Sequence, residues 1–236
     1  MTNPKFQAIS RQLTDDLDLT SPPIQVSYLD QPPAGVTAHP GGAPSVCTFF
    51  AEGGRAPFFV DLKAHEGCEV GAFVLGIPPK GELGDRLMAT IGQMQQEGYL
   101  HPGEEARVPH NASAPAFVAY GPLGSLPMPP TNVLLFAKPR SAMLALEAAP
   151  GPAPMNGRPM CAIVPILNQG APVAVSMGCT GSRIYTQMGD DRMVVGIRGD
   201  HLEAFAQSLH RIRRANAWVH DEDARRRDEA ARPFRP

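Results

Sequence analysis

The chain has 236 residues, of which 43% are hydrophobic and 19% are charged, a globular composition that excludes a wholly disordered protein. A net charge of -2 provides no overall basic field, so neither nucleic acid nor an anionic membrane is expected as a partner. Four cysteines are too few for a disulfide scaffold. Without an apolar leader or a long apolar run, the sequence predicts a reducing, cytoplasmic location.

The N-terminal half of the chain is predicted to alternate helices and short strands. Phe6, Ile9 and Leu13 recur at helical spacing, and the apolar stripe that begins at Leu83 predicts a second helix. Aromatic and β-branched runs, separated by a glycine-containing turn, favour a β-hairpin. The expected elements are helices 4–16 and 83–97, strands 24–29 and 116–120, and a hairpin of strands 47–50 and 57–60.

The C-terminal half is predicted to continue in the same way. Pro139 suits the first position of a helix, and Asp200 with Glu203 forms a capping-box pattern before another helix. Trp218 is expected to anchor that last helix by packing. The expected elements are strands 132–137 and 193–197, a second hairpin of strands 161–167 and 172–177, helices 140–148 and 200–218, and a charged, disordered tail at 220–236.

These elements predict an α+β fold with a mixed or antiparallel sheet and flanking helices, in one domain spanning residues 1–219. Two stretches, about 20–80 and 130–199, share the order cysteine, apolar run, Gly-(x)-Ala-Pro, apolar run, Gly-Cys. The cysteines lie 68 − 47 = 21 residues apart in the first copy and 179 − 161 = 18 in the second. We interpret the stretches as duplicated halves; two hairpins with coincidentally similar turns are the alternative.

Duplication would place all four cysteines at equivalent positions, where they could converge. Four thiolates are the ligand set of an iron–sulfur cluster or a zinc site, so Cys47, Cys68, Cys161 and Cys179 are candidate metal ligands. No pair has the CxxC spacing of common metal motifs. The competing interpretation is that Cys47 and Cys161 are small buried hydrophobic residues.

Cys68 and Cys179 each follow a glycine, where exposed functional thiols are expected. His65 and Arg183 lie close to them in sequence, and a nearby cation favours the thiolate. Cys68 or Cys179 could therefore act as a catalytic nucleophile, with His65 as base. The glycine-rich loops could instead bind a cofactor or a small anion through backbone N–H groups, and the candidate residues are Gly67, Gly71, Gly178, Gly181 and Arg183.

Other sites are weaker candidates. His101 and His110 lie in a proline-rich loop, and the pair Asp190-Asp191 is expected in a surface turn. Motifs for P-loop, Rossmann, zinc-protease, serine-hydrolase and covalent-haem chemistry are missing. Noncovalent haem with one axial Cys or His remains an alternative cofactor. A small-molecule substrate or a redox partner is expected, and an exposed sheet edge could form a homodimer.

Several of these segments resemble the family catalogued as domain of unknown function 169. The resemblance covers about residues 19–209 and is carried by the order of the four cysteines, the stretch from Pro139 to Met143, and Gly178-Cys179-Thr-Gly-Ser-Arg183. Similar proteins are frequent in anaerobic organisms, which suits an oxygen-sensitive cluster or a redox cofactor. The first glycine-rich segment departs from the family's commoner Cys-x-Gly-Gly form and reads Cys68-Glu-Val-Gly71.

Overall fold

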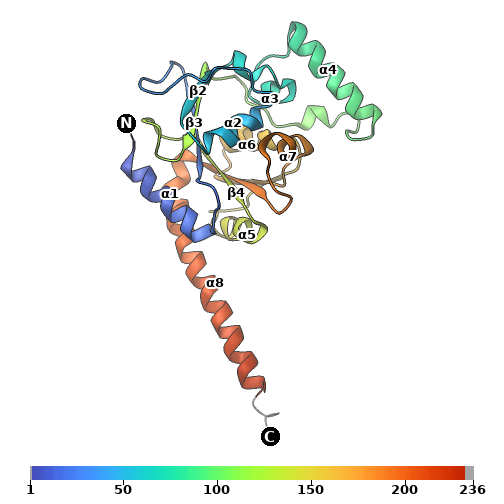
Figure 1. Cartoon of the computed structure of the whole chain (residues 1–236). Coiled ribbons are helices and arrows are strands. Elements are labelled where there is room, and N and C mark those ends of the chain that lie inside the picture. The colour runs from blue at the N-terminus through green and yellow to red at the C-terminus, as the bar shows by residue number, and fades with distance from the viewer. Residues whose placement is uncertain (1, 232–236) are drawn as a thin grey trace.

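A computed structural model describes residues 2–231 of the chain. The α+β prediction is confirmed, because eight α-helices accompany a seven-stranded mixed sheet (Figure 1). The elements are α1 (Pro4–Leu17), β1 (Ile24–Leu29), α2 (Val46–Gly53), β2 (Phe58–Asp61), α3 (Glu69–Val74), α4 (Gly81–Gln96), β3 (Phe117–Pro122), β4 (Asn132–Ala137), α5 (Pro139–Ala148), β5 (Met155–Asn156), α6 (Ile163–Asn168), β6 (Val173–Ser176), α7 (Thr180–Thr186), β7 (Met193–Arg198) and α8 (Leu202–Ala231).

The sheet runs in the order β2-β3-β1-β4-β7-β6-β5, with antiparallel neighbours except for the parallel pair β5 and β6. The antiparallel pair β1 and β4 lies at its centre. From that centre outwards, β3 and β2 flank β1 on one side, and β7 and β6 flank β4 on the other. On each side the central strand (β1 or β4) is followed outwards by the strand that comes last in that half of the sequence (β3 or β7) and then by the one that precedes it (β2 or β6). This shared order is compatible with two related halves; their duplication stays a prediction.

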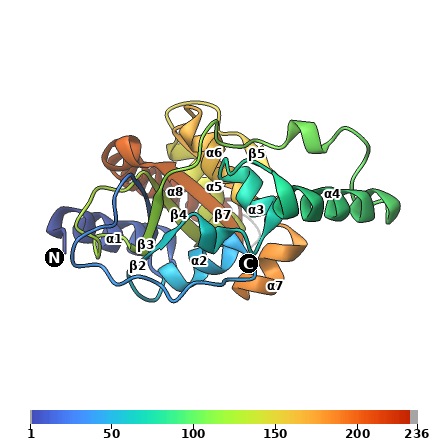
Figure 2. The ribbon, with the colours of Figure 1, turned by 90° about the horizontal axis from the view of Figure 1, so that it is seen from above.

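Helices cover both faces of the sheet. Alternate residues of β4 point to opposite sides, so Val133 and Leu135 join a core with α1, α5 and α8, whereas Leu134 joins one with α2 and α6. The second core also contains two cysteines, Cys47 and Cys161. In both views α4 lies at the periphery of the body (Figures 1 and 2).

The two predicted hairpins are wrong, and they are wrong in the same way. Residues 47–50 lie in α2, and residues 161–167 form a 3-10 turn (Met160–Ala162) followed by α6. In each case only the second run is a strand, β2 or β6. α2 is buried on several sides and begins at Ser45, whose hydroxyl accepts the Cys47 N–H at 3.2 Å. A short helix that is buried on several sides has no continuous polar face, so its sequence has the same apolar pattern as a buried strand.

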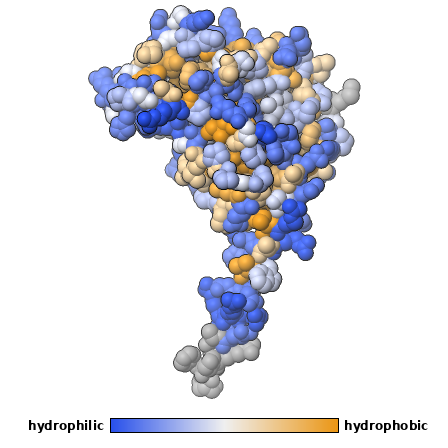
Figure 3. Space-filling view, turned by 180° about the vertical axis from the view of Figure 1, so that it is seen from behind, coloured by the Kyte–Doolittle hydropathy of each residue, from blue (hydrophilic) through white to orange (hydrophobic). Residues whose placement is uncertain are grey.

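The C-terminal region also differs from the prediction. α8 is one continuous helix through Ala231, so the described part of the expected disordered tail is helical, and residues 232–236 lie outside the described residues. The helix projects from the body (Figure 1), and its projecting part is mostly hydrophilic (Figure 3). Trp218, 65% exposed, is not a packing anchor. A 3-10 turn precedes α8, and the Asp200 carboxylate accepts from Arg198 at 2.7 Å.

No helix among residues 2–231 combines the length and the apolar character that a membrane span requires.

Candidate functional site

The four cysteines lie at or near the starts of helical segments on one face of the sheet. Cys47 is in the first turn of α2, and Cys161 is in the 3-10 turn before α6. Cys68 and Cys179 are the N-cap residues of α3 and α7. α2 contacts α3, α7 and the 3-10 turn that carries Cys161, which brings residues from distant parts of the chain together.

Cys161 lies at the centre of this group. It is fully buried and hydrogen-bonded to Cys47, and it is close enough to Cys47, Cys68 and Cys179 for the charge of each thiolate to act on it. The Cys47 hydrogen bond and burial raise the pKa of Cys161 well above its ordinary value. The same interaction lowers the pKa of Cys47.

Cys68 and Cys179 form the half-buried edge of the group. Each sulfur accepts a backbone N–H three residues further on, from Gly71 at 3.3 Å and from Ser182 at 3.4 Å. Burial raises the pKa of Cys68, and the Gly71 N–H opposes this effect. All four cysteines are free thiols. We call these four residues the cysteine cluster.

Two tyrosines of the sheet, buried Tyr120 and half-buried Tyr28, face the cysteine cluster. Tyr120 lies within electrostatic range of Cys47 and Cys161, and its hydroxyl is 3.0 Å from Nε2 of His65. Burial is the main cause that raises the pKa of Tyr28, to about 12, and its hydroxyl accepts from Asn111 at 3.1 Å. Both phenols are therefore neutral. The strand patterns alone gave no signal that these polar groups, or Asn111, border the cysteines.

The hydrogen bonds of His65 define its protonation. Nδ1 lies 3.1 Å from the Asp61 carbonyl, which can only accept, so Nδ1 carries the proton and Nε2 accepts from Tyr120. Burial lowers the His65 pKa to about 4, so the ring is neutral at pH 7. With both ring nitrogens engaged, this geometry does not support His65 as a base for Cys68. It supports a role in orienting Tyr120.

The sequence model of DUF169, a family described as uncharacterised ArCR, matches residues 12–208, which is most of the chain. The chain belongs to the DUF169 family. No curated protein and no solved structure matches it.

The glycines predicted to bind a ligand have structural roles in this DUF169 protein. A Cβ on Gly67 would lie 2.4 Å from the Ala43 carbonyl oxygen, and one on Gly71 would lie 2.5 Å from Val46. Gly178 has a φ of +84°, which other residues rarely adopt. Gly181 has more room, since its nearest neighbour would be 3.9 Å away. The first three glycines thus allow close approach or a tight turn.

Arg183 is also engaged within the protein. It donates to the carbonyls of Met177 at 2.9 Å and Gly189 at 2.8 Å, and so ties the loop after α7 to the end of β6. Its guanidinium still lines an open pocket beside Cys179. The sequence placed Arg183 near the thiol but gave no signal that both of its terminal nitrogens donate to backbone carbonyls.

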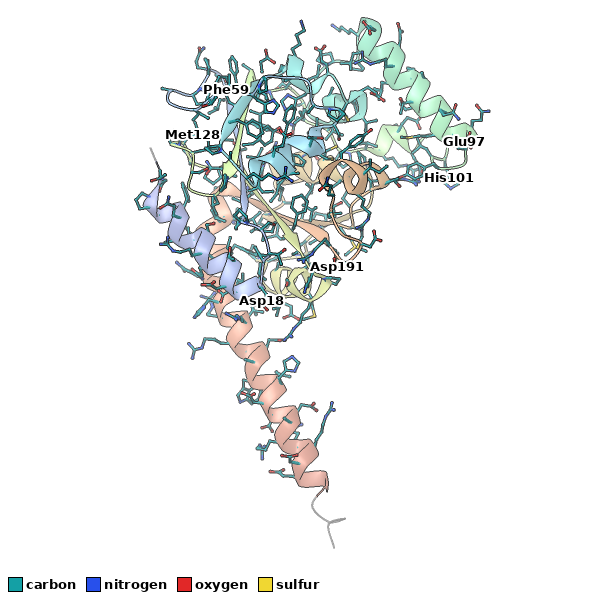
Figure 4. The ribbon with its side chains drawn as sticks, viewed as in Figure 1. Asp18, Phe59, Glu97, His101, Met128 and Asp191 are labelled. Carbon is teal, nitrogen blue, oxygen red and sulfur yellow. The ribbon has the colours of Figure 1, made fainter. Side chains whose placement is uncertain are left out.

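Residues 2–231 of the DUF169 chain include no group of three or more His, Cys, Asp and Glu side chains arranged to hold a single metal ion. Of the weaker candidates, His101 is beyond the outer end of α4 (Figure 4), and Asp191 is in the turn before β7, next to Asp190, which lies 3.8 Å from Arg183. His101 and Asp191 are exposed. The cysteine cluster is therefore the candidate site.

Proposed function

We propose that this DUF169 protein is a cytoplasmic redox or cofactor-binding protein whose cysteine cluster binds an iron–sulfur cluster or a related thiolate-ligated metal centre. The observation that carries the proposal is that the four cysteines share one core, in which Cys47 and Cys161 are buried and against which Cys68 and Cys179 pack. Four thiolates are soft ligands that suit iron and zinc. A reducing cytoplasm would keep them free.

The described residues do not have the crowded ligand set of a single zinc ion. In a Cys₄ zinc site every sulfur lies about 2.3 Å from the same ion, so all four crowd together. Among the described residues no three candidate ligands meet that condition. An iron–sulfur cluster distributes its cysteines over several irons and accepts a wider arrangement.

The surrounding residues suit such a centre. When bound, the centre would supply one-electron transfer. Cys47 and Cys161 would hold its buried side, and Cys68 and Cys179 its half-buried side. The neutral hydroxyls of Tyr28 and Tyr120 bring no charge, and His65 and Asn111 fix their orientation. Hydrogen bonding and burial around the sulfurs are what set the potential of such centres.

The deciding experiment is purification without oxygen, followed by absorption spectroscopy and metal analysis. We expect a brown protein with broad absorption and about two or more iron atoms per chain. A sharp Soret band would indicate haem instead, and a colourless, metal-free protein would refute the proposal.

A matched pair of variants tests the role of Cys161. Cys161→Ser and Val164→Thr each place a hydroxyl at a buried position with little change in volume, in neighbouring turns of the same segment. We expect Cys161→Ser to lose its iron and Val164→Thr to keep it. Iron retained at the wild-type level in Cys161→Ser would contradict the four-ligand arrangement.

A cysteine nucleophile is the second candidate, because Cys179 lines an open pocket. This function requires no metal. It predicts a colourless protein in which iodoacetamide modifies one thiol, Cys179, much faster than the other three, with loss of activity. Four slowly reacting thiols would contradict it.

A further inference from the structure

An open pocket of about 580 Å³ lies beside Cys179. Three separate segments form it: Tyr99 after α4, residues 157–158 before the Cys161 turn, and residues 177–184 around the start of α7. A cavity of this size is in the range of small-molecule sites. Because Cys179 belongs both to this lining and to the cysteine cluster, a molecule in the pocket would lie next to the candidate centre.

The lining of the pocket is positively charged. It includes Arg158 and Arg183, and none of the described residues that line it is Asp or Glu. Arg158 stacks over the Tyr99 ring at 4.4 Å and lies 3.2 Å from Glu104, whose carboxylate is outside the lining. Arg183 lies 3.8 Å from Asp190, which is likewise outside the lining, so each guanidinium has one acidic neighbour and is held in place before any ligand arrives. Guanidinium groups favour carboxylates, which they bind through charge-assisted hydrogen bonds.

The rest of the lining includes several exposed apolar side chains. Ile184 is 66% exposed, Met177 is 47% exposed, and Tyr99 is 37% exposed. Such large apolar groups, gathered around a hollow rather than scattered singly, are typical of a ligand-binding surface. The pocket therefore offers two cations and an apolar wall to the same molecule.

We infer that this pocket binds a small organic carboxylate attached to an apolar or aromatic group. Arg158 is the main partner of the carboxylate, because Arg183 donates to the backbone carbonyls of Met177, Gly189 and Arg192, whereas Arg158 donates to Glu104 through Nη2. The apolar part packs on Ile184 and Met177. The binding of this molecule is independent of the function proposed above. Its role as a substrate of the metal centre rests on that function.

The test compares phenylacetate with phenylacetamide, which has nearly the same shape and no charge. Ligand-observed NMR titrations of the full chain give both dissociation constants. We expect phenylacetate to bind at least about tenfold more tightly, the usual contribution of a charge-assisted hydrogen bond. Equal binding of the two compounds, or no binding of either, would overturn the inference.

Two variants with matched controls locate the binding. Arg158→Gln removes one cation from the pocket, and its control, Arg211→Gln, removes an exposed cation from α8. Ile184→Glu adds a negative charge to the pocket, and its control is Met88→Glu on α4, where the side chain is equally exposed at 66%. We expect both pocket variants to weaken phenylacetate binding by about tenfold and both controls to leave it unchanged. Wild-type affinity in both pocket variants would place the binding elsewhere.

Iron analysis of the same samples separates this inference from the proposed function. Phenylacetate binding without iron would leave the pocket in place and refute the metal centre. Iron without preferential binding of phenylacetate would refute the pocket and leave the metal centre in place.

Discussion

Cys68 and Cys179 have the same local role but different surroundings. Each caps a short helix that follows a strand, β2 in the first half and β6 in the second, and each sulfur accepts the N–H of the third helical residue. Around Cys68, burial dominates and raises the thiol pKa. Cys179, in contrast, lines an open pocket with two arginines. The comparison indicates that one structural device, half-buried in both halves of the sheet, borders a pocket in the second half.

The residues around the two caps explain the difference. Three residues before the cysteine, the first half has buried His65 and the second half has Ser176. Three residues after it, the first half has Gly71 and the second half has Ser182. The Ser182 hydroxyl accepts the Cys179 N–H at 2.9 Å and completes a capping box. A side chain at Gly71 would collide with Val46, so the first half has no room for the same box.

The largest expected effect concerns His65, which only the first half contains. Its pKa falls from 6.5 in the unfolded chain to about 4 in the folded one, so only the unfolded state takes up this proton in that window. The contribution of neutral His65 to the free energy of unfolding is therefore complete above pH 6.5. It is lost as the pH falls towards 4, a decrease of about 3 kcal/mol. Urea unfolding at pH 7 and pH 4.5 measures it.

The His65→Gln variant isolates this contribution from that of the carboxylates. Its stability should fall less between pH 7 and pH 4.5 than that of the wild type, whereas His110→Gln, at an exposed position, should behave like the wild type. An equal loss in His65→Gln and the wild type would show that His65 is not held neutral by burial. The loss of stability in acid would then have a source other than the buried histidine near Cys68.

The next effect tests the close approach of α2 and α3. In Gly71→Ala the new Cβ would lie 2.5 Å from Val46 Cγ2 and 3.0 Å from the Cys68 sulfur. We expect a loss of about 2 kcal/mol in the free energy of unfolding, because the helices must move apart. Gly92→Ala on α4 is the control, since nothing lies within 4 Å of its Cβ, and it should be neutral or stabilising. Urea titrations of both variants decide whether the contact is as tight as described.

These contacts also show how far the sequence could predict the site. The repeated order of cysteines and glycines drew attention to four residues that lie in or against one core, although by a different route from the predicted hairpins; their role as ligands stays a prediction. Strand 132–137 and the helix begun by Pro139 could be predicted from β-branched and proline signals that act locally. The helical form of residues 47–50 could not, because burial on several sides removes the periodic polar face.

The polar surroundings of the cysteines could not be predicted either. Tyr28 and Tyr120 look like ordinary strand residues, and their meeting with Asn111 and His65 depends on pairing between β1 and β3 and on a distant loop. Arg158 belongs to a proline-rich loop with no motif. Such contacts are properties of the tertiary arrangement, and single-sequence patterns do not contain them.

The smallest expected effect concerns the capping box of α7. Ser182→Ala removes the hydroxyl that accepts the Cys179 N–H and leaves Cys179 with the simpler cap that Cys68 has. The loss of a cap hydrogen bond costs about 1 kcal/mol, and the sulfur keeps its own bond from the backbone of residue 182. Thermal unfolding should therefore show a small decrease in stability, while the rate of Cys179 alkylation in the metal-free chain should rise, because the start of α7 opens more often. A stability loss without faster alkylation would mean that the box supports the fold but does not control access to the thiol, and the contrast between Cys68 and Cys179 would then rest on the pocket alone.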